Sequence, residues 1–258
     1  MAVGALPQTC GATQAPVAWL RPGLCGYVGP DLGVDLHAAS IGVLTVGLDA
    51  PFVVETPEHG AIRTRSVYAP GRARHRVISP EGRILLLFTD PSAAVAMRRQ
   101  VGRYGLEHRL ERELIAACRH GADLEYLRLV ADPCLTGGTD RRIRGGATDR
   151  RIRRVVDEIR EEPARILRAE HSAHGLGMST PYFLRLFASQ TGTTFRRYQQ
   201  WNRLLEAARG LAAGHNLTRC AADAGFASPS HLSDTFHETF GTTASAVLGS
   251  NVRIELDV

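Results

Sequence analysis

Hydrophobic residues are spaced in two different ways along the chain. Between residues 34 and 90, short apolar and β-branched runs alternate with turns rich in Pro and Gly, such as Ala69-Pro70-Gly71. The runs are 41–48, 52–55, 62–67 and 83–88. Short strands at this spacing are typical of a β-sandwich or barrel. The first half of the chain is therefore predicted to be a β domain.

From residue 91 onward the apolar spacing becomes helical. One helix face would carry Leu106, Leu110, Leu114, Ile115 and Cys118, and a second helix would begin with Leu124, Leu127 and Val130. This pattern predicts a helical hairpin with an apolar stripe. We expect the stripe to form one side of a dimer seam; the alternative is that its leucines are core residues against the β domain.

The segment 132–149 follows neither spacing. Four glycines lie there among charged residues, which is typical of a flexible linker. Beyond it the spacing is helical almost throughout, as in Ile152, Val155, Val156 and Ile159. The predicted domains are 1–131 (effector sensing and dimerisation), 132–149 (a linker rich in Gly and Arg) and 150–258 (all-α).

The helical domain contains an internal repeat. Ala173 and Gly177 match Ala221 and Gly225, and the later matches are Phe187 with Phe236 and Gly192-Thr193-Thr194 with Gly241-Thr242-Thr243. A small Ala at a helix crossing, a Gly four residues later and a polar N-cap are what a helix-turn-helix requires. One such pattern is weak evidence, because any helical hairpin can contain it. Two copies joined by one long helix predict a double helix-turn-helix.

Composition narrows the class of protein. The 258 residues are 44% hydrophobic and 22% charged, which excludes a wholly disordered chain. No apolar run approaches the roughly 20 residues of a membrane span, and no secretion signal precedes residue 10, so we expect a cytoplasmic protein without membrane contact. The five cysteines form no CxxC pair, which argues against a disulfide framework or a zinc knuckle.

The charge of the chain is carried in an unusual way. All 31 basic side chains are arginines, and the formal net charge is +5. Guanidinium groups suit phosphate and guanine edges, so a polyanionic partner fits this charge, although many basic proteins bind no nucleic acid.

Residues 150–248 resemble the DNA-binding domain of the AraC/XylS family of bacterial transcription regulators. The resemblance rests on the helix 151–159, the segment 179–187 followed by Thr191-Gly192, Phe195 and Tyr198, and the segment 225–241. Residues 34–90 more loosely resemble the cupin-like effector domain that often precedes it, with Ala69-Pro70-Gly71 and His75 at matching places. The resemblance implies an α+β multidomain fold: a cupin-like β-sandwich or barrel with a helical hairpin, then an all-α double helix-turn-helix.

Three residues depart from the family pattern. Ser172 replaces a leucine in the first scaffold helix, and Ala244 replaces a proline after the second motif. Asp234 stands where the second recognition helix often has a basic residue, so it would repel phosphate or accept from a cytosine amino group.

The resemblance implies a sequence-specific regulator that binds double-stranded DNA, not an enzyme, with no cofactor. Arg185 is the best candidate for a base contact, and Arg196 and Arg197 are candidates for phosphate contacts. The full set of expected DNA-binding residues is Ser179, Thr180, Pro181, Tyr182, Leu184, Arg185, Arg196, Arg197, Ser228, Pro229, Ser230, His231, Ser233 and Asp234. The other expected partners are a second copy of the chain, RNA polymerase and an unidentified small-molecule effector.

His37 and His75 are the candidate effector-binding residues. Cupin folds often bind iron or manganese, but the clustered histidines and carboxylate of a metal cupin are not present here, so no metal is expected. Two alternatives stay open: a cupin-type metal-dependent oxygenase, and a small-molecule binding protein that does not recognise an operator. The metal content of the purified protein tests the oxygenase alternative.

Overall fold

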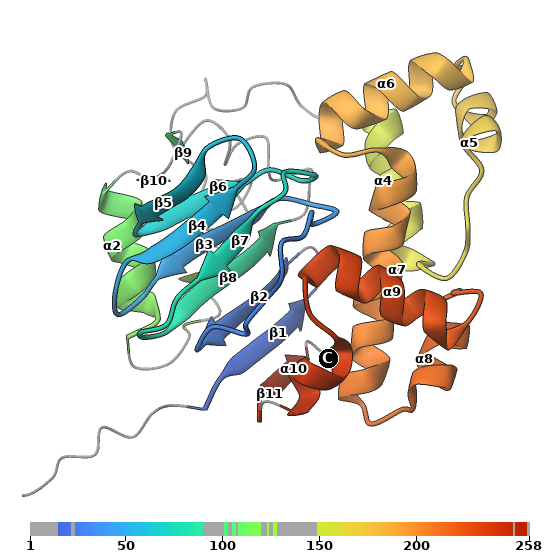
Figure 1. Ribbon diagram of the computed structural model, residues 1–258. Helices are drawn as coiled ribbons and strands as arrows, with labels where there is room; N and C mark the ends of the chain where they lie inside the picture. Colours follow the sequence, from blue (N-terminus) through green and yellow to red (C-terminus); the bar gives the residue numbers. More distant parts are fainter. Residues whose placement is uncertain are drawn as a thin grey trace, which may run out of the picture.

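The computed structural model describes residues 15–21, 24–89, 101–102, 105–106, 108–119, 123, 126–127, 149–249 and 251–256. Strands dominate up to residue 106 and helices from residue 150, so the α+β fold class is confirmed (Figure 1). The predicted linker lies outside the described residues except for Asp149. Its bounds, and those of the two domains beside it, stay predictions.

In the described part of the N-terminal half, two larger sheets lie beside the two-stranded pair β9–β10. The larger sheet has the strand order β11-β1-β2-β8-β3-β6 and the smaller β5-β4-β7. Neighbouring strands are antiparallel except β11 and β1, which are parallel. The strands are β1 (Val17–Arg21), β2 (Leu24–Gly29), β3 (Val43–Gly47), β4 (Phe52–Thr56), β5 (Gly60–Thr64), β6 (Ser66–Ala69), β7 (Arg76–Ile78), β8 (Ile84–Thr89), the short pair β9 (Val101–Gly102) and β10 (Gly105–Leu106), and β11 (Arg253–Leu256).

Each of the four predicted runs overlaps a strand, but the run 62–67 joins the end of β5 to the start of β6, and the pattern missed β1, β2 and β7. Pro22 and Gly23 read as a turn, and Gly26 weakens the apolar run of β2. The structure explains Gly26: a Cβ there would lie 2.2 Å from the ring of Trp19. Leu106 was also misplaced, because it belongs to β10 rather than to a helix.

One face of the larger sheet is covered by α2 (His108–Ala117). Strand pairing puts Trp19, Leu44 and Leu87 on this face, in one hydrophobic cluster with Leu114 and Cys118. Leu114 and Cys118 are both fully buried within the single chain. The dimer seam predicted through these two residues is therefore wrong, and they are core against the sheet. The side chain of Leu110 lies outside the described part.

The opposite face of the larger sheet is shared between two partners. Part of it packs on the smaller sheet through Tyr27, Phe52 and Val54. The rest, including Phe88, packs on Trp201 of the helical half. The second half of the chain thus closes one side of the β-sandwich (Figure 1).

The helical half consists of short helices around one long one. They are α4 (Arg150–Glu161), α5 (Ala169–Gly175), α6 (Thr180–Thr191), α7 (Phe195–Ala212), α8 (Leu217–Asp223), α9 (Pro229–Phe240) and α10 (Ala244–Gly249). The chain then returns to the first half, where β11 pairs with the edge strand β1. Because β11 needs a distant sheet edge as its partner, local periodicity did not predict a strand in this domain.

Among the described residues, no helix is long and apolar enough to cross a membrane.

Candidate nucleic-acid interface

The sequence repeat is also a structural repeat. Helices α5 and α6 form the first copy, and α8 and α9 form the second. In each copy a glycine in the left-handed region makes the turn, with φ of +66° at Gly177 and +72° at Gly225. In the second turn the N–H of Phe226 donates to the carbonyl oxygen of Ala221 at 2.8 Å, and the first turn has the equivalent bond. Both copies are helix-turn-helix units, as predicted.

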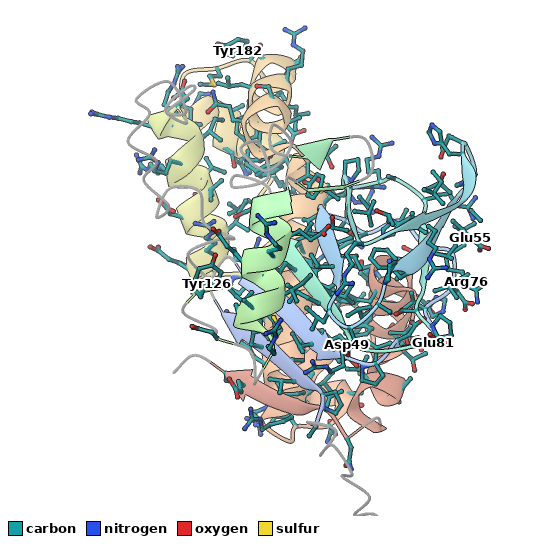
Figure 2. All side chains as sticks on the ribbon, turned by 90° about the vertical axis from the view of Figure 1, so that its left-hand side faces the viewer. Asp49, Glu55, Arg76, Glu81, Tyr126 and Tyr182 are labelled. Atoms are coloured by element: carbon teal, nitrogen blue, oxygen red, sulfur yellow. The ribbon has the colours of Figure 1, made fainter. Side chains whose placement is uncertain are left out.

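Helix α6 is oriented by two phenylalanines on its inner face. Phe183 and Phe187 are fully buried, and their ring centroids lie 5.1 and 5.3 Å from that of Phe195. The opposite face is turned outward, so that Tyr182 is 46% and Leu184 39% exposed, and Figure 2 shows Tyr182 at the far end of the molecule. Of the other expected contacts on this segment, the exposed ones are Ser179, Pro181 and Arg185, and Thr180 is half-buried.

Helix α9 is built in the same way. Leu232 and Phe236 are buried on its inner face, and the side chain of Ser228 caps the helix by accepting from the N–H of His231 at 3.1 Å. The exposed residues of the expected set are Ser230, His231 and Asp234, and the half-buried ones are Ser228, Pro229 and Ser233. The structure therefore places both expected sets on the outer faces of the second helices.

The two arginines at the start of α7 have different surroundings. Arg196 is exposed, as a phosphate contact requires. Arg197 is half-buried close to the N-terminal half, where the hydroxyl of Thr193 donates to the carbonyl oxygen of Ser40 at 3.1 Å. Burial and the neighbouring Arg72 lower the pKa of Arg197, and one of its terminal nitrogens is buried without a hydrogen-bond partner among the described residues. Arg196 is the more accessible of the two expected phosphate contacts.

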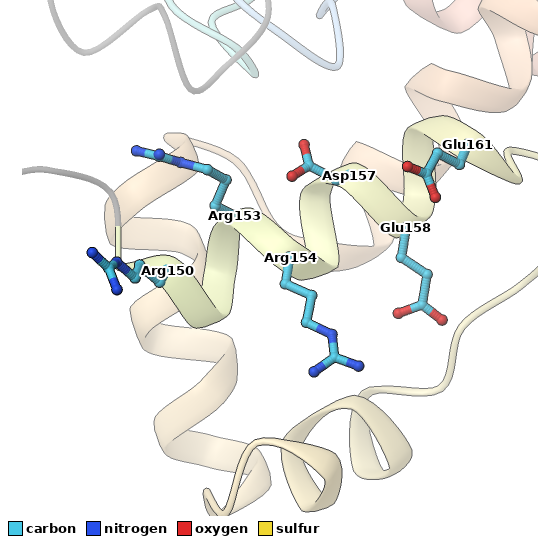
Figure 3. A pocket seen from close by; sticks show the side chains of 6 residues that line it. All are labelled: Arg150, Arg153, Arg154, Asp157, Glu158 and Glu161. Carbon is cyan, nitrogen blue, oxygen red and sulfur yellow. The ribbon is translucent and has the colours of Figure 1, made fainter.

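Sequence reasoning missed a set of arginines on α4. Arg150, Arg153 and Arg154 lie on its outer face and form no ion pair with a described residue, while three acidic residues follow toward the helix C-terminus (Figure 3). Positive charge at a helix N-terminus opposes the helix dipole, so this order of charges does not favour helix stability. The run of arginines at 150–154 was the available signal in the sequence.

His37 and His75, which are distant in sequence, lie side by side. They form an isolated antiparallel bridge, and their ring centroids are 4.8 Å apart. The Nδ1 atom of each ring contacts a backbone carbonyl oxygen, at 2.9 Å for His37 and 3.0 Å for His75. His37 also lies next to Gly241, so this histidine faces the end of α9. In the described part of the chain, no cluster of three or more metal-ligating side chains accompanies these histidines.

The stability of the fold is expected to fall with acidity because of His75. This side chain is 3% exposed, and burial lowers its pKa from 6.5 to about 4. Between these values the unfolded chain binds a proton that the folded chain excludes, so the free energy of unfolding decreases as pH falls through this window. His75→Gln should flatten this dependence, measured by urea unfolding at several pH values. His171→Gln, at an exposed position of α5, should keep the wild-type slope; equal slopes in all three proteins would contradict the assignment to His75.

Comparison with known proteins gives two kinds of match. The family model of a helix-turn-helix domain, of the AraC type, matches residues 172–250. This range contains α6, α7, α8 and α9 with both predicted turns. No curated protein matches the sequence.

Solved structures of ToxT from Vibrio cholerae share the fold over about nine tenths of this chain. The apo form of a ToxT variant from Vibrio cholerae is 13% identical, with a TM-score of 0.56, covering 90% of this chain and 98% of that one. ToxT from the same organism with a bound unsaturated fatty acid is 11% identical, with a TM-score of 0.52, covering 91% of this chain and 92% of that one. At sequence identities this low, the similarity establishes a shared fold alone.

Proposed function

We propose that this chain, whose residues 172–250 are a helix-turn-helix domain of the AraC type, regulates transcription by binding double-stranded DNA of particular sequence. The observation that carries the proposal is the pair of helix-turn-helix units joined by α7, each with a second helix whose outer face is exposed. One chain would then place α6 and α9 in two successive major grooves, about 34 Å apart.

The proposed roles follow from exposure and chemistry. Arg185 on α6 would form a bidentate contact with guanine, and Leu184 would contact a thymine methyl group. Arg196 and Arg197 would contact phosphate, which positions the protein without specifying sequence. The remaining contacts would come from Ser179, Thr180, Pro181, Tyr182, Ser228, Pro229, Ser230, His231, Ser233 and Asp234.

We further propose that the N-terminal β half senses a small molecule, with His37 and His75 at the effector site. The related ToxT structure holds an unsaturated fatty acid, which supports a ligand for this fold without identifying one here. The protein would work in the cytoplasm as a homodimer, with RNA polymerase as a further partner and without catalysing a reaction. Sedimentation tests the dimer, whose contact surface must lie away from the buried Leu114 and Cys118.

The affinity for DNA is expected to depend steeply on salt. Each phosphate neutralised by an arginine releases condensed counterions, with a slope of about −0.9 in log affinity against log salt. The wild-type chain should first enrich a preferred duplex from a pool of random sequences. Its affinity for that duplex is then measured by gel shift between low and physiological salt, and a flat response would contradict contact through the arginines.

Two arginine variants should distinguish the recognition of bases from the contact with phosphate. Arg185→Ala should cost roughly 1–3 kcal/mol of binding free energy and relax the preference at one guanine. Arg196→Ala should instead weaken binding equally on selected and scrambled duplexes and reduce the magnitude of the salt slope by about one unit. Titrations of both duplexes at several salt concentrations check this. Unchanged sequence preference in Arg185→Ala would show that α6 does not read bases through this residue.

A further inference from the structure

The two helix-turn-helix turns are supported differently. At the first turn, nothing lies within 4 Å of where a Cβ of Gly177 would be. At the second turn, a Cβ of Gly225 would lie 2.5 Å from the carbonyl oxygen of Ala164, in the connection between α4 and α5. The second turn is therefore enclosed, whereas the first is open on this side.

Arg203 of α7 contacts the enclosed turn from within the helical half. Its Nη1 donates to the carbonyl oxygen of Gly225 at 3.0 Å, and its Cζ lies 4.9 Å from the centroid of the Phe226 ring. The planar guanidinium thus holds both the backbone and the side chain of the turn. A lysine could supply the charge but not the flat face or the directed pair of contacts.

The contact continues from the turn into the second recognition helix. Phe226 is buried in the cluster that holds Leu232 of α9, and its ring meets that of His231 edge to face, with centroids 5.4 Å apart. His231 is exposed on the face proposed to meet DNA. Arg203 is therefore connected to α9 by way of Phe226, although it belongs to α7.

The first turn is held in a different way. Among the described residues, no side chain donates to the carbonyl oxygen of Gly177, and Met178 of this turn packs on the apolar cluster that contains Val155 of α4. The Nε of Arg203, by contrast, is buried without a hydrogen-bond partner among the described residues. A buried donor without an acceptor costs free energy, and it persists here because the other contacts of the guanidinium fix its orientation.

We propose that Arg203 is a positioning residue, which sets the orientation of α9 for DNA through Gly225 and Phe226. This role rests on the proposed binding of α9 to DNA. Arg203 would then fix how α9 is aligned relative to α6. Arg203 lies seven residues after Arg196, on the same face of α7. Arg196 would contact phosphate, while Arg203 would contact the second turn and not the DNA.

The first test uses the duplex that the wild-type chain enriches from a random pool. Arg203→Met keeps the stem of the side chain but loses the charge and the fork. It should lose protection over the half-site read by α9, keep protection over the half-site affected by Arg185→Ala, and bind about 10- to 100-fold more weakly. Arg203→Lys should restore little of this, because charge alone does not hold the turn. Full rescue by lysine, or equal weakening of both half-sites, would overturn the proposal.

The matched control is Arg209→Met, which removes one charge from the same helix. Arg209 pairs with Glu206 at 3.2 Å. This variant should keep protection of both half-sites. If Arg203→Met and Arg209→Met have the same effect, only the net charge of α7 matters, and the positioning role is contradicted.

A second measurement tests the role of Arg203 without DNA. The N–H of Phe226 donates a hydrogen bond to the carbonyl oxygen of Ala221, and the hydrogen-exchange rate of this N–H reports the local stability of the second turn. Exchange should be faster in Arg203→Met than in Arg209→Met, and Phe226→Leu should add little to the effect of Arg203→Met, since both act along one path. Unchanged exchange would overturn the proposal even if DNA binding is confirmed. Failure of the wild-type chain to enrich any duplex would instead count against the proposed function.

Discussion

Replacing Trp201 with alanine is expected to lower the free energy of unfolding by about 3–5 kcal/mol. Trp201 lies in the middle of α7 and is 1% exposed. Its ring centroid is 6.0 Å from that of Phe88 in the larger sheet and 5.9 Å from that of Phe240 in α9. The truncation would leave a cavity where the helical half packs on the sheet, so it weakens the contact between the two halves as well as the local core.

Urea unfolding of the wild type and the variant measures this loss. The control is Tyr182→Ala, which removes a large ring that is 46% exposed on α6. Its effect should stay within about 0.5 kcal/mol, as expected for a surface position. A loss below about 1 kcal/mol in Trp201→Ala would contradict the packing of α7 on the sheet, because buried aromatic truncations cost several times more.

Gly225→Ala is expected to destabilise the protein more than Gly177→Ala does. Both glycines have positive φ, +72° and +66°, and an alanine in this region costs about 1–2 kcal/mol. Only at Gly225 would the new Cβ also meet backbone, 2.5 Å from the carbonyl oxygen of Ala164. The overpacking should add roughly 1–3 kcal/mol, so that the second turn is strained and α9 is displaced.

Thermal unfolding of the two alanine variants compares these costs directly, and gel shifts on the selected duplex show whether α9 still binds. Gly177→Ala serves as the matched control, because it carries the same backbone strain without the close contact. Equal melting temperatures for the two variants would show that the loop at Ala164 yields easily and that the second turn is not enclosed.

Local signals predicted most of the helical half. The repeat of Ala and Gly, the polar caps and the 3.6-residue spacing each depend on neighbours close in sequence, and they placed α4, both turns and the outer faces of α6 and α9. The exposed residues of the candidate site, such as Tyr182 and Arg185, followed from the same spacing, because the buried residues of an amphipathic helix fix the opposite face.

Contacts between distant segments were not predicted, because no local pattern encodes them. The apolar stripe of α7 was visible in the sequence, but it serves three clusters: Tyr198 packs with the first motif, Leu204 with the second and Trp201 with the sheet. An apolar stripe that is wider than the two helix-turn-helix units can cover indicates that α7 packs on a further element. The width of the stripe does not identify that element. The pairing of β11 with β1 is hidden for the same reason.

Hydroxyl-radical footprinting on the selected duplex tests most directly whether one chain reads two successive major grooves through α6 and α9. Two protected segments should lie on one face of the DNA, about one helical turn apart, and Arg185→Ala should weaken only one of them. A single protected segment, or protection that is the same on a scrambled duplex, would contradict the binding of both helices to successive grooves.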